Sequence, residues 1–179
     1  LAQQILRLPK HNKFYVISSG KNGIGEQENS GKTPRGWHQI AQKIGGEVEK
    51  NAVFVARQPT GEVYNQQLAQ QFPQRDWILS RILWLDGLED GFNRGDGCDT
   101  FKRYIYIHGT PDTEPMGIPM SHGCIRMKNQ DVIELSDVEA VTTEQITNKV
   151  FEMVDAIASH KQKRALELYY DLLALKEPA

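Results

Sequence analysis

The sequence has few cysteines and no long run of apolar residues. Its 179 residues include two cysteines, Cys98 and Cys124, with no C-x-x-C pair and no H-x-x-x-H spacing. This is too few for a disulfide framework or a structural zinc site, so we expect free thiols and neither a metal nor another cofactor. No apolar run approaches the roughly 20 residues of a membrane-spanning helix. A net charge of −2 gives no reason to expect a nucleic-acid partner.

One of the two cysteines lies in an unusual segment, Ser121–Met127. Cys124 follows Gly123 directly, and His122 and His108 precede it by two and sixteen residues. A thiol with an ordinary pKa of about 8.5 is mostly protonated near neutral pH, so a nucleophilic cysteine needs a base or a cation close by. A lone cysteine is more often a small buried hydrophobe, but polar residues beside a glycine are poor core sequence, and glycine permits a turn that exposes the thiol. The pattern indicates a nucleophilic cysteine whose pKa, in an intact site, lies well below that of a free thiol.

Five segments together carry a family resemblance. Tyr104–Thr110 alternates aromatic and β-branched residues and ends in His-Gly-Thr, and Ser121–Met127 contains Ser-His-Gly-Cys followed by an apolar residue and Arg. Ser30–Gly36 has the form of a Lys-Thr-Pro-x-Gly turn, and Ile82–Leu85 and Gly91–Asn93 lead into the stretch that bears the histidine. In these features the chain resembles the L,D-transpeptidase family, the YkuD-type catalytic domain of bacterial cell-wall enzymes.

The resemblance implies roles in covalent acyl transfer for the residues of the two motifs. Cys124 is the expected nucleophile and His108 the general base, which the backbone carbonyl of Gly109 orients. The backbone amides of Gly123 and Cys124 are expected to form the oxyanion hole. His122 is expected to line the site and to help polarise the substrate.

The substrate that the resemblance implies is a peptidoglycan stem peptide, cleaved between its diamino acid and the terminal D-Ala. Arg126 is suited to a bidentate contact with a substrate carboxylate, and Ser121 and Thr110 are further expected substrate contacts. Carbapenem-type β-lactams are the expected inhibitors. The acyl acceptor stays open, because an amine of a second stem gives a cross-link, a lipoprotein lysine gives anchoring, and water gives an L,D-carboxypeptidase.

The predicted elements indicate a mainly β catalytic domain over residues 1–136, and the resemblance implies a sandwich-like or mixed sheet with short helices. Strands are expected at residues 1–8, 13–18, 37–42, 52–57, 77–85 and 102–107, and short helices at 66–71 and at 129–135, the latter capped by Asn129. Trp37, Trp77 and Trp84 are expected in the core or, alternatively, in the wall of a groove for the glycan strand.

Residues 137–179 have a helical pattern and no catalytic constellation. Thr142–Gln145 has the spacing of a capping box before apolar residues at helical intervals, and a second helical stretch, Ala165–Leu175, follows a break at Ser159–Gln162. The segment resembles a helical part of the DNA polymerase III delta subunit, a clamp-loader component, and we infer a chimera joined near Ser136–Glu139. A helix pair alone supplies no clamp-loader function, so we expect this hairpin to pack or to self-associate.

Two classes of function remain open. The first is the enzyme described above, and the second is a cell-wall-binding or scaffold protein with a helical interaction tail, compromised because no final strand follows the cysteine motif. Cys98, in the turn-rich segment Gly95–Asp99, is interpreted as an incidental loop thiol. We expect the bacterial cell envelope (the periplasm) as the location if a leader has been removed, and the cytoplasm is the alternative, since no signal peptide is visible.

Overall fold

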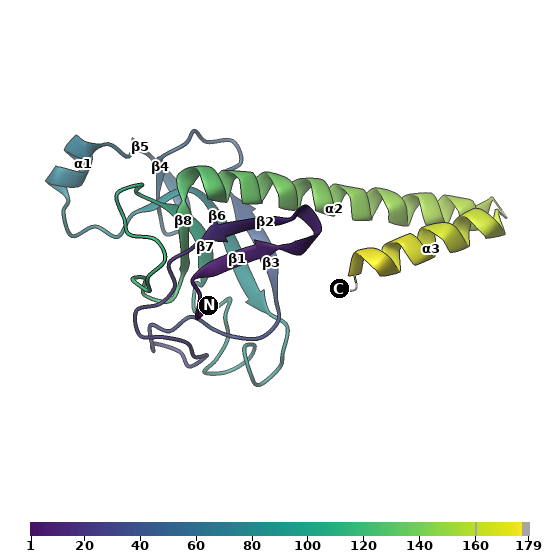
Figure 1. The fold of residues 1–179 in the computed structure, drawn as a ribbon, viewed down its shortest axis with the longest axis horizontal. Helices are drawn as coiled ribbons and strands as arrows, with labels where there is room; N and C mark the ends of the chain where they lie inside the picture. Colours follow the sequence, from purple (N-terminus) through teal and green to yellow (C-terminus); the bar gives the residue numbers. More distant parts are fainter. Residues whose placement is uncertain (160, 177–179) are drawn as a thin grey trace. The chain divides into compact units, whose positions relative to one another are not determined.

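The computed structural model describes the backbone of residues 1–159 and 161–176, and the side chains of residues 1–137, 153–159 and 161–170. The chain divides into two compact units, Leu1–Ser136 and Asp137–Ala179. Figure 1 shows the strands gathered in the first unit and the helices of the second.

The first unit contains the strands, a short 3-10 helix and a short α-helix. In chain order its elements are β1 (Ile5–Leu8), η1 (Pro9–His11), β2 (Lys13–Val16), β3 (His38–Ile44), β4 (Ala52–Val55), β5 (Gln58–Val63), α1 (Gln66–Gln71), β6 (Ile78–Gly87), β7 (Tyr106–Thr110) and β8 (Ile125–Lys128). β1 and β2 form a two-stranded antiparallel sheet, and the other strands form a six-stranded sheet in the order β5-β4-β6-β7-β8, with β3 also paired to β6. β7 and β8 run parallel, whereas the other pairs are antiparallel. The expected mainly β fold with a mixed sheet is confirmed.

The central strand β6 is apolar along most of its length because both faces of the sheet are covered. Successive side chains point to opposite faces of a strand. Leu83 therefore enters a core cluster with Ile107 and Met127, while Ile82 and Trp84 enter a second cluster. The two cores fix the register of the strands, since a shift of one residue would exchange the faces.

The helix that follows β8 differs from the expectation. A single helix, α2, spans Asn129–Ala158, so residues 129–135 are not a separate short helix, and Thr142–Gln145 lies inside α2 instead of starting a helix. The side chain of Asn129, which was expected to cap the helix, forms hydrogen bonds to the sheet. Its side-chain amide donates to the carbonyl of Thr110 at 2.8 Å, and its side-chain oxygen accepts from the hydroxyl of Ser80 at 2.6 Å. Asn129 therefore ties the start of α2 to two strands of the sheet.

The second unit is helical. It contains the later part of α2 and α3 (Gln162–Lys176), which begins a few residues before the expected stretch. Of its described side chains, Ala156 and Leu168 are buried, while Ile157 and Leu166 are about half exposed. These two exposed residues border an open apolar groove. In the described part of the chain, no helix is long and apolar enough to span a membrane.

The three tryptophans have two different environments. Trp77 and Trp84 are buried, as a core position requires. Trp37 is 66% exposed, so its expected place in the core is wrong. The backbone N–H of Trp37 donates a hydrogen bond to a carboxylate oxygen of Glu89 at 2.6 Å.

Candidate active site

The parallel pairing of β7 and β8 brings the two sequence motifs side by side. His108 lies opposite Arg126, and Ile107 lies opposite Ile125, so Cys124, just before β8, lies level with Tyr106. Since side chains alternate along a strand, Cys124 and Arg126 share one face with His108. Cys124 packs there against the cluster that contains Trp84 and Tyr106.

His108 is buried and held in one orientation. Its Nδ1 lies 2.8 Å from the carbonyl oxygen of Gly109, the contact that the family resemblance implies. If Nδ1 carries the proton and donates to this carbonyl, Nε2 is left as an acceptor. Burial lowers the pKa of His108 below its usual value, although the Gly109 carbonyl and the Asp76 carboxylate oppose the shift. A neutral imidazole is the form that can act as a base.

Gly109, which follows this histidine, packs closely against the side chain of Asn129. A Cβ built on Gly109 would lie 2.5 Å from the side-chain oxygen of Asn129 and 2.5 Å from the carbonyl oxygen of Leu79. Only glycine fits at this position without displacing the backbone. The His-Gly pair therefore has a packing reason as well as its expected catalytic role, which stays a prediction.

The Cys124 thiol has an environment that differs from the expected one. Its Sγ lies 3.5 Å from the carbonyl oxygen of Tyr104, which can accept a hydrogen bond from the thiol. Desolvation raises the pKa of Cys124 to about 11, because it outweighs the opposing effects of the Tyr106 backbone, Arg126 and Arg103. The expectation of a pKa well below that of a free thiol is therefore wrong for this state. The resting pair is a neutral thiol and a neutral imidazole.

The loop before the nucleophile is shaped by Ser121 and Gly123. Ser121 is buried, and its hydroxyl donates to the carbonyl of Cys124 and accepts from the amide of Gly123 at 3.2 Å. Gly123 has a φ of 126°, a backbone conformation that side chains with a Cβ rarely adopt. The Gly123 amide thus has an internal partner in this state. Thr110 is also buried, with its carbonyl bound to Asn129.

Arg126 already contacts two carboxylates. Its guanidinium lies 2.7 Å from Asp76 and 3.4 Å from Glu114. Asp76 also lies 3.4 Å from Nδ1 of His122, an exposed side chain. Desolvation opposes ionisation of Asp76, but Arg126 and the two nearby histidines outweigh it and lower the pKa of its carboxyl. No sequence signal marks Asp76, because it comes from the segment before β6, far from both motifs.

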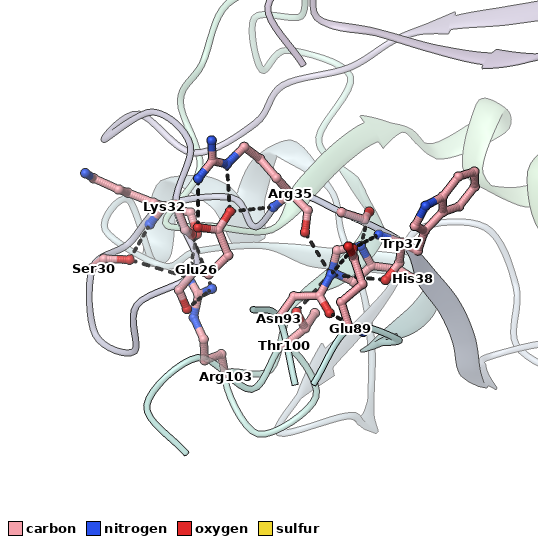
Figure 2. Close-up of polar contacts among 12 residues, drawn as sticks. Glu26, Ser30, Lys32, Arg35, Trp37, His38, Glu89, Asn93, Thr100 and Arg103 are labelled. Carbon is pink, nitrogen blue, oxygen red and sulfur yellow. Dashed lines mark hydrogen bonds and ion pairs between the residues drawn. The ribbon is translucent and has the colours of Figure 1, made fainter. Parts of the chain in front are cut away.

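The segment Ser30–Gly36 supports the nucleophile loop. Thr33 donates from its hydroxyl to the carbonyl of Gly123 at 2.9 Å and accepts from the amide of Gly20 at 2.8 Å. Arg103 holds the same segment, donating to the carbonyl oxygens of Glu26 at 2.7 Å and of Lys32 at 2.6 Å (Figure 2). Through these contacts the Ser30–Gly36 turn packs against the loop that carries Cys124.

A second polar cluster joins the remaining segments of the family resemblance. Asn93 is fully buried, and its amide donates to the carbonyl oxygens of Arg35 at 2.9 Å and of Trp37 at 3.1 Å (Figure 2). Its side-chain oxygen accepts from the backbone N–H of Glu89 at 3.0 Å. Asn93 therefore locks the Gly91–Asn93 segment onto the Ser30–Gly36 segment.

Cys98 lies apart from these contacts. Its thiol lies 3.7 Å from the carbonyl of Arg94 and 3.8 Å from that of Gly95, within its own loop. Both cysteines are free thiols. Among the described residues, no group of three or more His, Cys, Asp or Glu side chains is placed to hold a metal ion.

Comparison with protein families assigns the chain. The family model of the L,D-transpeptidase catalytic domain (YkuD) matches residues 2–147, and that of the DNA polymerase III delta subunit, C-terminal domain, matches residues 147–179. No curated protein matches the chain. Since the first match covers most of the chain, the protein belongs to the L,D-transpeptidase catalytic domain family, whose members act on peptidoglycan stem peptides. Both resemblances inferred from the sequence are confirmed.

The two family matches meet later than expected. They meet at residue 147, whereas we expected a joint near Ser136–Glu139. The compact units divide at Ser136, inside the first match. The assignment of separate domains to residues 1–136 and 137–179 therefore stays a prediction. The second match is a similarity over a short helical segment, residues 147–179.

Proposed function

We propose that the protein is a cysteine acyltransferase that cleaves the bond between the diamino acid and the terminal D-Ala of a peptidoglycan tetrapeptide. Family membership supports L,D-transpeptidase-type chemistry on peptidoglycan in general. One observation supports this particular site: β7 and β8 hold Cys124 on the same face as His108, whose Nδ1 lies 2.8 Å from the Gly109 carbonyl. This contact leaves Nε2 of His108 to accept the thiol proton.

The proposed first half-reaction begins from neutral groups. Because the pKa of Cys124 is raised to about 11 and that of His108 is lowered, the proton moves from Sγ to Nε2 as the sulfur attacks the scissile carbonyl, not before. The oxyanion forms against the amides of Cys124 and Gly123, the latter exchanging its contact with Ser121 for the substrate oxygen. The C–N bond then breaks, and His108 returns the proton to the departing amine of D-Ala. A thioester remains on Cys124.

The proposed second half-reaction transfers the acyl group. Neutral His108 takes a proton from an incoming amine or water, which attacks the thioester carbonyl, and the sulfur leaves and regains a proton from the imidazolium. An amine acceptor gives a transpeptidase product and water gives an L,D-carboxypeptidase product. We propose the cell envelope as the place of this reaction and carbapenem-type β-lactams as inhibitors, since both follow from the same family chemistry.

Asp76 is proposed as a positioning residue. It lies 2.7 Å from Arg126 and 3.4 Å from His122, so one carboxylate holds both side chains beside the reacting pair. A substrate carboxylate can reach Arg126 by displacing Glu114, the more distant partner at 3.4 Å. In this arrangement Arg126 keeps one internal carboxylate while it binds one from the substrate. Ser121 and Thr110 are proposed to act on the substrate through the loop and strand that they stabilise.

A scaffold function is the second candidate, and one observation favours it. The raised pKa of Cys124 is what a buried, unreactive thiol would show. A scaffold protein would bind stem peptides without turning them over, and its helical unit would supply self-association.

Mass spectrometry of purified disaccharide-tetrapeptide tests the proposal. After incubation with the protein, we expect a product that has lost D-Ala, together with a cross-linked dimer if a stem amine is the acceptor. A Cys124→Ala control in the same buffer should leave the tetrapeptide intact. Unchanged tetrapeptide with the folded wild-type protein, combined with measurable binding, would select the scaffold function instead.

A further inference from the structure

The turn between β4 and β5 has an unusual backbone. Val55 pairs with Gln58, so the hairpin closes through the two residues Ala56 and Arg57. Their φ angles are 47° and 67°, and both therefore lie in the left-handed region. Two-residue turns of this kind are usually built from Asn-Gly or similar pairs, because other residues are strained there. Strained backbone of this type concentrates at functional sites.

The side chain of Arg57 lies against the aromatic residues beside Cys124. Its guanidinium carbon is 4.9 Å from the ring centre of Trp84 and 4.6 Å from that of Tyr104. It also donates a hydrogen bond to the hydroxyl of Tyr106 at 3.1 Å. The nucleophile borders the same group of aromatic residues, since Cys124 packs against the cluster that contains Trp84 and Tyr106, and its thiol lies 3.5 Å from the carbonyl oxygen of Tyr104. The guanidinium of Arg57 and the thiol of Cys124 therefore border the same group of aromatic residues.

The other arginines near the nucleophile are already engaged. Arg126 contacts the carboxylates of Asp76 and Glu114, and the guanidinium of Arg103 is bound by backbone carbonyl oxygens. Arg57 differs from them, because among the described residues its contacts are two ring faces and one hydroxyl, with no carboxylate. A guanidinium has five N–H donors, so most of those on Arg57 remain for another acceptor.

We propose that Arg57 is a substrate-binding residue that receives a carboxylate of the stem peptide next to Cys124. This inference rests on the proposed function. The ring faces and the Tyr106 hydroxyl hold the guanidinium plane in advance, so little side-chain entropy is lost when a carboxylate forms a two-pronged, charge-assisted contact. The strained turn sets the position of the side chain. Two carboxylates of the stem can fill this place: that of the terminal D-Ala, or that on the side chain of a diaminopimelate residue.

Calorimetric titration of tetrapeptide into the protein of residues 1–179 tests the proposal without requiring turnover. Arg57→Gln removes the charge, and Arg57→Lys keeps the charge but loses the planar fork. Arg7→Gln is the matched control, because it makes the same charge change at an exposed residue of β1 whose guanidinium donates to the side-chain oxygen of Gln3 at 3.3 Å. Three peptides are compared: the free tetrapeptide, its C-terminal amide, and a version with Lys in place of diaminopimelate.

The expected result is an increase in Kd of about tenfold or more for Arg57→Gln with the free peptide, a smaller increase for Arg57→Lys, and wild-type affinity for Arg7→Gln. The peptide that lacks the bound carboxylate should bind wild type and Arg57→Gln alike, which identifies the carboxylate. Equal affinities of wild type and Arg57→Gln for all three peptides, an equal loss in Arg7→Gln, or no binding by wild type would overturn the proposal. If Arg57→Gln does not fold, the Lys variant and the altered peptides on wild type give the same decision.

A parallel assay of D-Ala release separates this inference from the proposed function. If peptide binding depends on Arg57 but no D-Ala is released, the role of Arg57 stands and the proposed enzyme activity is wrong. If D-Ala is released but peptide binding does not depend on Arg57, the enzyme activity stands and the role of Arg57 is wrong.

Discussion

The unit of residues 1–136 and the unit of residues 137–179 bury their apolar residues in different ways. In the first, Leu79, Ile82 and Leu83 have no exposed surface, because strands from distant segments pair along both edges of β6 and core clusters cover both of its faces. In the second, Ile157 is 57% exposed and Leu166 49% exposed. Pairing between distant strands fixes side chains as precisely as catalysis requires. Helical periodicity, in contrast, only sets which residues share a face. Substitutions in the first unit should therefore act on catalysis, and those in the second on association.

The largest expected effect is on the nucleophile. Cys124→Ala should lower D-Ala release from tetrapeptide by about 10³-fold or more, because no group remains to form the thioester. Cys98→Ala is the matched control and should retain wild-type activity, since its thiol contacts only its own loop. Intact-protein mass spectrometry should show one carbapenem adduct on wild type and on the Cys98 variant. An unchanged mass of folded wild type would count heavily against Cys124 as nucleophile.

The next effect concerns the glycine behind the general base. Gly109→Ala should lower the free energy of unfolding by roughly 2 kcal/mol or more, because the new methyl group would lie 2.5 Å from a backbone oxygen. Gly46→Ala is the control, since a Cβ there would meet nothing within 4 Å. Urea unfolding of both variants measures the difference. A Gly109 variant as stable as the Gly46 variant would show that the strand can move aside.

Arg126→Lys should cause a smaller loss. We expect kcat/KM for the tetrapeptide to fall about tenfold or more, because lysine cannot contact two carboxylates in the planar geometry of the guanidinium. The same conservative change at Arg7 serves as the control. Wild-type kinetics for the Lys variant would reduce Arg126 to a structural ion pair.

The pH dependence should distinguish a neutral pair from a preformed ion pair. His108 has a lowered pKa, so activity should persist below pH 6.5 and fall only when the buried imidazole is protonated. Asp76→Asn should shift this acid limb to lower pH, because Asp76 raises the pKa of His108. Asp86→Asn is the control, as its carboxylate contacts Gln39 on the neighbouring strand. An acid limb that moves to higher pH in the Asp76 variant would contradict the conclusion that the Asp76 carboxylate raises the pKa of His108.

The same groups predict how stability changes with pH. The folded pKa of Cys124, about 11, lies above the ordinary pKa of a thiol, so the thiol contributes stability that is present below that ordinary value and lost as the pH rises toward 11. Cys124→Ala should flatten this alkaline loss. Thermal melts of wild type and variant between pH 8 and pH 10.5, interpreted through linkage, measure the effect.

The smallest effect on chemistry should come from the helical unit. Truncation after Ser136 should leave carbapenem labelling of Cys124 within about twofold of wild type, since no expected site residue lies beyond it. It should shift the protein toward monomer in light scattering, because the exposed apolar groove residues of the helices are removed. Unfolding of the truncated form would instead make the helices an integral part of the catalytic fold, and the inferred chimera would lose its main support.

The sequence alone determined the family and the two motifs of the site, whereas the parallel pairing of β7 and β8 that joins the motifs comes from the structure. The alternation of Tyr104–Thr110 predicted a strand at His108, although β7 begins at Tyr106 and continues beyond His108 to Thr110. The short glycine-containing segment Ser121–Met127 predicted a turn before the cysteine. Both are local signals, since periodicity and turn residues act over a few positions. The separate short helix expected at residues 129–135 was wrong, and so was the helix start at Thr142–Gln145. A capping-box pattern can also occur inside a longer helix, as it does in α2.

Only the tertiary structure decided the electrostatics of the site. Asp76 reaches Arg126 from the segment before β6, and Arg57 reaches Tyr106 from a hairpin turn, and neither carries a sequence mark. The direction of the Cys124 pKa shift also follows from packing: the cation within the motif predicted a lowered pKa, but desolvation by the surrounding cluster outweighs it. A pKa depends on every charge and every buried surface around the group, and those neighbours come together only when distant segments fold.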